Sequence, residues 1–211
     1  MQRPVLTGLI VALVCQAIFL VRLSVPHMPV FDEVHYLPAA RALLALSAPA
    51  NIEHPPFAKE LIAIGMRLFG DNPFGWRFMS TLAGSATIGG IFALTYLLTG
   101  RTRAALYGAA AGLLSFTVYV QARIAMLDIV MIAALAIAAW QFAAATARPE
   151  QGRWRLALTG IALGLALGSK WNAIPLAMAP GIAFFLARLG AGRRRLFLSR
   201  RGAPVPGIRL V

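Results

Sequence analysis

Two adjacent carboxylates, Asp32 and Glu33, follow the first apolar stretch of the chain. Carboxylates beside a bilayer are costly unless they are paired or functional, so these acids mark a candidate site. An acid in front of a helix can also act as a cap, because its oxygens accept backbone N–H groups and suit the helix dipole. One acid is enough for a cap. The other could accept a proton from an incoming hydroxyl, which is general-base chemistry.

A second polar cluster begins at His54 and continues to Lys59 and Glu60. The two prolines after His54 predict a stiff turn that leads into a helix, but they do not explain the histidine and the lysine. His54 together with Glu53 and Asp32 could hold a divalent cation, although this spacing is not diagnostic. The predicted chemistry requires no cofactor and no metal, and a divalent cation stays open as an alternative.

Three cations, Arg77, Arg123 and Lys170, are predicted at the level of the acidic pair. Each could simply extend to the membrane interface, and Arg123 could pair with Asp128 at a helix end. Together they could instead bind a phosphate group, for which arginine offers two parallel hydrogen bonds.

The composition is that of an integral membrane protein. Of the 211 residues 59% are hydrophobic and 13% are charged, and the mean hydropathy is +0.74. Soluble domains carry about 45–50% apolar and about 25% charged residues. The net charge of +13 does not indicate nucleic-acid binding, because much of it lies in short loops between apolar segments and no reading motif is present. The single Cys15 excludes an internal disulfide.

The hydropathy pattern predicts an all-α fold with about six transmembrane helices and one large external loop, residues 26–75. The predicted spans are residues 5–25, 76–99, 104–121, 128–146, 154–169 and 173–189. The first span has no cleavage signal and is predicted to be a retained anchor. With both termini in the cytoplasm, thirteen of the 20 Lys and Arg residues lie inside, as the positive-inside rule requires.

Within the external loop, apolar residues at helical spacing predict two amphipathic helices, residues 34–46 and 57–69, at the membrane interface. Asn72 and Pro73 resemble the cap and first turn of the next helix. Residues 1–190 are interpreted as a membrane-embedded catalytic module. Residues 191–211 are expected to be a basic cytoplasmic tail, either disordered or truncated.

Four segments together resemble the protein O-mannosyltransferase family, glycosyltransferase family 39. They are FDEVHY, HPPFAKELIAIGMRLFGDNPFGWR, ARIAMLDI and GLALGSKWN, in the family's order. The resemblance implies the multi-helical GT-C fold. It also implies transfer of a sugar from a dolichyl or polyprenyl monophosphate to an acceptor hydroxyl outside the cytoplasm, with inversion. Family members are typically more than twice as long, so the chain is expected to correspond to their N-terminal portion.

The resemblance also implies residue roles. Asp32 corresponds to the base and Glu33 to its acidic neighbour, while Arg77 and Lys170 would hold the lipid phosphate, together with Arg123. The remaining matched positions are His54, Lys59 and Asp128.

The function expected on these grounds is transfer of a hexose, mannose in the commonest family chemistry, to protein Ser or Thr. The expected partners are the lipid-linked sugar, the acceptor and membrane lipids, with no nucleic acid. In a bacterium the location would be the inner membrane, with the site on the periplasmic side. A lipid or glycan acceptor, or an inactive truncated membrane partner, stay open as alternatives. A transporter is disfavoured because the spans are apolar through their centres.

Overall fold

All regular elements in residues 4–199, the part that this computed structural model describes, are helical. The longer helices are α1 (Pro4–Leu20), α2 (Glu33–Leu44), α3 (Phe57–Phe69), α4 (Pro73–Thr99), α5 (Thr102–Leu114), α6 (Phe116–Gln121), α7 (Leu127–Ala147), α8 (Gly152–Ser169) and α9 (Ile174–Ser199). Two single turns, η1 (Pro149–Gln151) and η2 (Trp171–Ala173), flank α8. The chain divides into two compact units, residues 1–173 and 174–211, and α9 belongs to the second.

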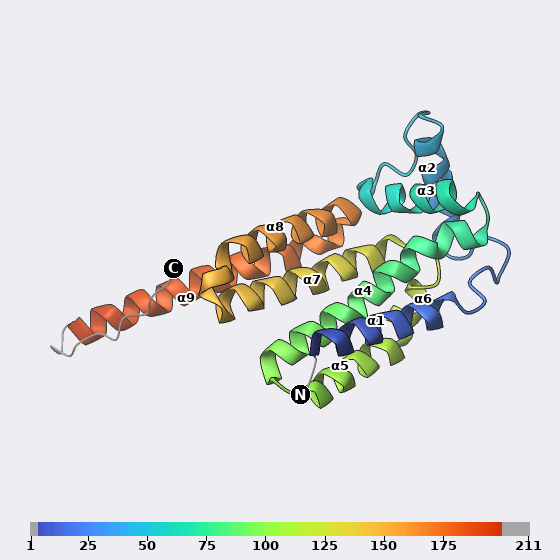
Figure 1. Ribbon diagram of the computed structural model, residues 1–211. Coiled ribbons are helices and arrows are strands. Elements are labelled where there is room, and N and C mark those ends of the chain that lie inside the picture. Colours follow the sequence, from blue (N-terminus) through green and yellow to red (C-terminus); the bar gives the residue numbers. More distant parts are fainter. Residues whose placement is uncertain (1–3, 200–211) are drawn as a thin grey trace. The chain divides into compact units, whose positions relative to one another are not determined.

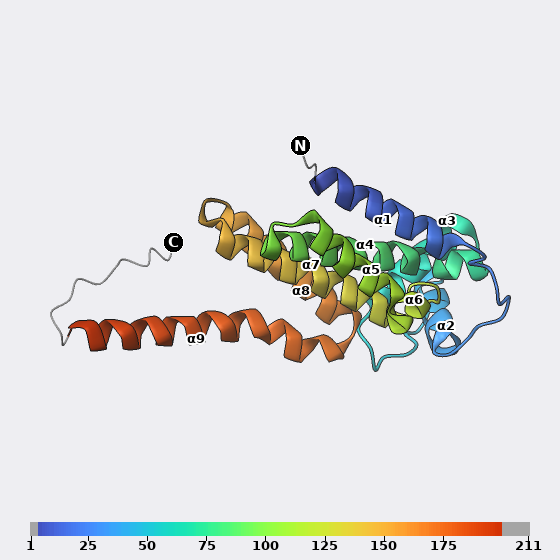
Figure 2. The ribbon, with the colours of Figure 1, turned by 90° about the horizontal axis from the view of Figure 1, so that it is seen from below.

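In the first unit α4 is the central helix, with α1 and α5 packed on one side and α7 followed by α8 on the other (Figures 1 and 2). The apolar core includes Phe19, Ile88, Leu127 and Ile129, all of which are fully buried. At Gly84 the helix α4 meets the segment between α6 and α7 so closely that a Cβ would lie 2.4 Å from the Cβ of Ala122. This contact holds the start of α7 against α4.

The external segment folds as predicted into two helices, α2 and α3. Helix α3 packs on α4, and α2 packs on α3. Figure 1 shows α2 and the loop after it projecting beyond the ends of α4 and α8. The Asn72 side chain accepts hydrogen bonds from the backbone N–H groups of Phe74 and Gly75, with Pro73 as the first helical residue, which confirms the predicted cap.

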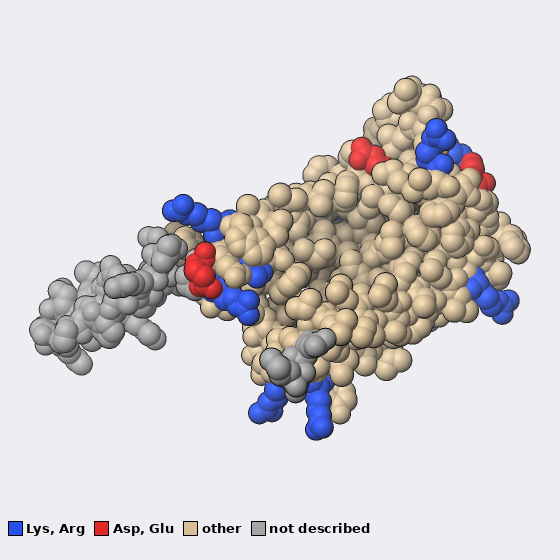
Figure 3. Space-filling view, in the orientation of Figure 1, with Lys and Arg blue, Asp and Glu red and all other residues tan. Residues whose placement is uncertain are grey.

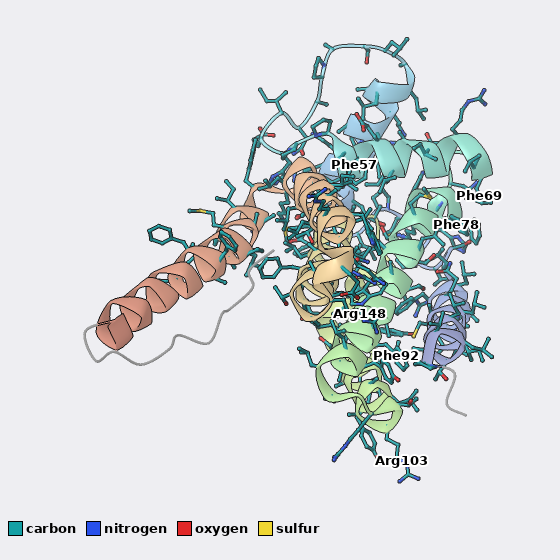
Figure 4. The ribbon with its side chains drawn as sticks, turned by 60° about the vertical axis from the view of Figure 1, so that its left-hand side comes forward. Phe57, Phe69, Phe78, Phe92, Arg103 and Arg148 are labelled. Carbon is teal, nitrogen blue, oxygen red and sulfur yellow. The ribbon has the colours of Figure 1, made fainter. Side chains whose placement is uncertain are left out.

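Two of the described helices, α4 and α7, are long and apolar enough to cross a membrane, while α1 and the segment Trp171–Leu186 are shorter apolar helices. The count of six spans therefore stays a prediction. On the face that Figure 3 shows, charged side chains gather at the ends of the bundle and leave its middle uncharged. In Figure 4 the cation Arg103 lies at the end of the bundle opposite to Phe57 and Phe69 of α3.

Two predicted segments differ from the structure. The predicted span 104–121 is divided, because Ser115 has an extended backbone with ψ of 115° and separates α5 from α6. The predicted tail begins as helix, since α9 continues to Ser199. The rest of that tail, residues 200–211, lies outside the described residues.

Candidate functional site

The two adjacent acids have different environments. The side chain of Glu33 is fully buried and accepts four hydrogen bonds. Its Oε1 accepts from Arg77 Nε at 2.8 Å and from the backbone N–H of Ala125 at 2.7 Å. Its Oε2 accepts from Arg77 Nη2 at 2.8 Å and from the backbone N–H of Val30 at 2.9 Å. Both carboxylate oxygens are therefore saturated, and Glu33 is placed as a structural anchor.

Arg77, at the start of α4, is the ion-pair partner of Glu33. Besides its two bonds to Glu33, it donates to the backbone carbonyls of Leu23, Pro26 and Met28 at 2.8–3.1 Å. A guanidinium group has five N–H donors, so all of them are occupied. This arrangement leaves no donor for the phosphate that the sequence assigned to Arg77. The Arg77–Glu33 pair instead ties the chain after α1 to α4 and to the segment before α7.

Asp32 remains available for chemistry. It occupies the position before α2, yet its side chain makes no capping hydrogen bond, and it is partly exposed. Within the described residues its carboxylate accepts one hydrogen bond, from Tyr36 Oη to Oδ2 at 3.3 Å. Capping therefore does not account for Asp32. A carboxylate with free lone pairs beside water can accept a proton from a bound hydroxyl.

Tyr36 is a site residue that the sequence analysis did not single out. Its side chain is buried one turn after Asp32, a spacing that brings both residues to the same face of α2. Burial raises the pKa of the Tyr36 phenol well above its usual range, and the negative charges of Asp32 and Asp128 raise it further. Tyr36 thus stays neutral and donates its hydrogen bond to Asp32. The spacing of four residues was the signal in the sequence that could have revealed it.

Asp128, near the start of α7, is paired with Lys170 at the end of α8. The ammonium group donates to both carboxylate oxygens at 2.7 and 2.9 Å, and the two side chains are 17% and 13% exposed. The next residue, Trp171, donates its indole N–H to the backbone carbonyl of Glu53 at 2.9 Å. These contacts join the ends of α7 and α8 to the external loop. The alternative Arg123–Asp128 pair is not formed.

Arg123 lies between α6 and α7 and binds neutral groups. Its Nη1 donates to Tyr119 Oη at 2.8 Å, its Nη2 donates to the backbone carbonyl of Val21, and its guanidinium lies over the Tyr119 ring. Its Nε is buried without a hydrogen-bond partner. Arg123 forms no ion pair with the described residues, so its charge is open to an anionic ligand.

His54 and Lys59 belong to the wall of the site. The buried Lys59 ammonium donates to the backbone carbonyls of Asn51 and His54, both at 2.7 Å, and so closes the loop before α3. Burial lowers the pKa of Lys59, and the charge of Glu53 partly offsets this effect. The His54 ring stands edge-on to Tyr36 with ring centres 6.1 Å apart, and its Nδ1 has no hydrogen-bond partner.

The structure thus connects Asp32, Tyr36, Asp128, Lys170 and His54 at one end of the bundle. The Glu33–Arg77 pair anchors the same region from within. Across the described residues, 4–199, no three His, Cys, Asp or Glu side chains come together in a way that could hold a metal ion. The divalent cation considered above stays an untested alternative.

Comparisons with known proteins identify a family and several relatives. Residues 53–203 match the family described as dolichyl-phosphate-mannose-protein mannosyltransferase. A polyprenol-phosphate-mannose–protein mannosyltransferase of Mycobacterium tuberculosis is 34% identical over an alignment that covers 93% of this chain and 43% of the relative. The protein of the same description from Corynebacterium glutamicum is 31% identical, over 69% of this chain and 34% of the relative.

The fold comparison agrees. The crystal structure of ArnT from Cupriavidus metallidurans in the apo state superimposes with a TM-score of 0.71 at 23% identity, over 92% of this chain and 38% of that one. The described residues thus have an all-helical fold similar to the GT-C membrane fold of ArnT, and two of their helices are long and apolar enough to cross a membrane.

Within that class, the chain belongs to the dolichyl-phosphate-mannose-protein mannosyltransferase family. It spans less than half the length of the curated relatives described here.

Proposed function

We propose that this chain carries the catalytic end of a membrane glycosyltransferase that moves mannose from a polyprenyl-phosphate carrier to a hydroxyl group of a protein Ser or Thr, on the external face. The family supports this donor and this acceptor, since its relatives are described as polyprenol-phosphate-mannose–protein mannosyltransferases. The observation that carries the proposal is the different environment of the two adjacent acids. The Glu33 carboxylate is held by Arg77, while the Asp32 carboxylate is partly exposed and accepts one hydrogen bond.

Asp32 is the general base of the proposed reaction. It takes the proton of the acceptor hydroxyl as the hydroxyl oxygen attacks the anomeric carbon, and the bond from that carbon to the phosphate oxygen breaks. The lipid phosphate leaves as an anion. Tyr36 holds the Asp32 carboxylate in place by its hydrogen bond, and it cannot compete as a base because its pKa is raised by burial. A positioned base contributes about 10²–10⁴ in rate.

The leaving phosphate requires cations. The hydrogen bonds of the predicted cations determine which of them can take this role. Arg77 is fully engaged, so Arg123 and Lys170 take this role in the proposal. Arg123 has an unpaired buried Nε, and Lys170 would exchange part of its contact with Asp128 for the phosphate. Charge-assisted hydrogen bonds of this kind are about twice as strong as neutral ones.

The test is transfer of mannose from polyprenyl-phosphate mannose to a Thr-containing peptide, in membranes that contain this chain. Asp32→Asn should lower transfer by about 10²–10⁴ and leave binding of polyprenyl phosphate unchanged. Glu60→Gln is the matched control, because Glu60 is an exposed acid of the same external segment. Equal transfer by the Asp32→Asn and Glu60→Gln variants would remove Asp32 as the base.

A further inference from the structure

One face of α2 leads outward from the proposed base. Asp32, Tyr36, Ala39 and Leu43 follow each other at intervals of four, three and four residues, the spacing that aligns side chains along a helix. Tyr36 contacts Asp32 through its hydroxyl and stands against the His54 ring. The reactive carboxylate is therefore the inner end of a continuous line of side chains.

The outer end of this line opens into a cavity. A volume of about 340 Å³ lies between the outer half of α2, the loop of residues 45–56 and the start of α3. Its walls are mostly small or apolar side chains, including Ala39, Ala42, Leu43, Ala50 and Ile52. His54 belongs both to this wall and to the contact with Tyr36, so the cavity lies next to the site around Asp32.

The predicted topology places the cavity on the aqueous side, because residues 26–75 form the predicted external loop. Figure 1 shows the outer half of α2 and its following loop beyond the ends of α4 and α8, and α4 is one of the two described helices that are long and apolar enough to cross a membrane. The same loop presents Leu46 and Ile52 to the outside, 93% and 77% exposed. Exposed apolar side chains around an apolar cavity are typical of a surface that binds a protein, a membrane or a ligand, and in the predicted external loop we take the occupant to be a polypeptide.

The distances match an extended polypeptide. A helix rises 1.5 Å per residue, so Ala39 and Leu43 lie about 10 and about 16 Å beyond Asp32 along α2. An extended peptide advances about 3.3 Å per residue, so this interval corresponds to about three to five residues.

We propose that the cavity binds an apolar side chain of the acceptor polypeptide, about three to five residues from the hydroxyl that Asp32 deprotonates. This inference rests on the proposed function and names its acceptor: an uncharged, extended polypeptide segment. Lys59 shapes the wall, because its ammonium group is already bound to the carbonyls of Asn51 and His54.

The test uses photo-crosslinking to the full chain in detergent. Uncharged peptides carry a central Thr and one photoreactive leucine, placed either next to the Thr or about four residues away on either side. Crosslinks identified by mass spectrometry should fall on α2 and the loop of residues 45–56 for the distant placement only. Crosslinking that does not depend on the placement would overturn the proposal.

A matched pair of variants isolates the cavity. Ala42→Leu fills it, whereas Ala45→Leu makes the same change at an exposed residue outside its lining. Ala42→Leu should weaken peptide binding, measured by fluorescence anisotropy, by about tenfold or more, and Ala45→Leu should leave it unchanged. Ala50→Leu is a second filling variant, in case Ala42→Leu does not fold, as judged by circular dichroism. Equal affinities in the filled and control variants would overturn the proposal.

The outcome separates the two proposals. A chain that transfers mannose to the peptide with equal affinity in the filled and control variants keeps the proposed function, and only the cavity proposal is overturned. A chain that binds the peptide in the cavity but no polyprenyl phosphate keeps the cavity and loses the proposed function.

Discussion

Two arginine–carboxylate pairs in the external half of the molecule have the same chemistry and different surroundings. Arg77 and Glu33 form two parallel hydrogen bonds of 2.8 Å and are fully buried. Arg41 and Asp71 also form two, of 2.7 and 3.0 Å, with side chains 45% and 48% exposed. The exposed pair is additionally supported by Trp76, whose indole N–H donates to Asp71 and whose ring faces Arg41.

The difference in burial determines how much each pair contributes to stability. Water can solvate either partner of the exposed pair when the other is removed, so such pairs contribute about 0–1 kcal/mol. No water reaches Glu33 or Arg77, and removal of one leaves a buried charge without its counter-ion. The buried pair therefore determines whether the segment after α1 and the start of α7 hold Asp32 and Asp128 in place. The exposed pair only links α2 to the turn before α4.

The largest effect should follow from Arg77→Met. This change leaves the buried Glu33 carboxylate and three backbone carbonyls without their hydrogen-bond donor, and the expected loss in the free energy of unfolding is about 3–5 kcal/mol. Unfolding in detergent, followed by circular dichroism against added denaturant, measures it. Arg67→Met is the control, because Arg67 is exposed on α3. Adding Glu33→Gln to Arg77→Met should recover part of the loss, and equal stabilities of the Arg77→Met and Arg67→Met variants would contradict the comparison.

Lys170→Met should have an intermediate effect. Asp128 is 17% exposed, so water replaces the lost ammonium only in part, and about 1–3 kcal/mol of unfolding free energy should be lost. Arg153→Met, at an exposed residue of α8, is the control. A double-mutant cycle with Asp128→Asn should show strong coupling. Additive effects of the two changes would mean that the observed pair contributes nothing.

Asn72→Ala removes hydrogen bonds between uncharged groups, and the resulting loss in the free energy of unfolding can be compared with that of the ion pairs. The Asn72 side chain caps α4 through two backbone N–H groups, and its loss should cost about 1 kcal/mol. Asn172→Ala makes the same change at an exposed residue and should have no measurable effect. If Asn72→Ala cost as much as Arg77→Met, the start of α4 would depend on its cap rather than on the buried pair.

The smallest effect is expected for Arg41→Ala, about 0.2–1 kcal/mol and less at high salt. Hydrogen bonding from Arg41 lowers the pKa of Asp71, so the carboxylate binds its proton more weakly in the folded state. The contribution of the pair is therefore complete above the unfolded pKa of about 3.9, and it disappears as the pH falls through the lower folded pKa. Denaturant titrations of both proteins from neutral to acidic pH should converge at low pH. A stability difference that does not change with pH would show that Arg41 acts by packing alone.

Local sequence signals predict the helices of the external segment with good accuracy. The apolar spacing of residues 57–69 predicts α3 with its observed bounds, and the prediction 34–46 differs from α2 by at most two residues. The division at Ser115 was not predicted, because the stretch 104–121 is apolar on average and contains neither a charge nor a proline, so hydropathy cannot locate an interruption within it.

The site was predicted in part. The acids, the cations and the two histidine-loop residues were all identified from the sequence, and the structure joins most of them at one end of the bundle. Their partners were not predictable. Whether Arg77 meets a ligand or Glu33 depends on which chain segments surround it, and three of its acceptors are backbone carbonyls, which every residue possesses.

The sequence by itself determines the helical class, the membrane character, the cap at Asn72 and the family, because these depend on composition and on interactions within a few residues. Only the tertiary structure decides which of two adjacent acids is free. Glu33 is buried by contacts with Arg77, 44 residues away, and with Ala125, 92 residues away. Such contacts form only when the chain has folded and water is excluded, since only then does an unpaired charge become costly enough to select its partner.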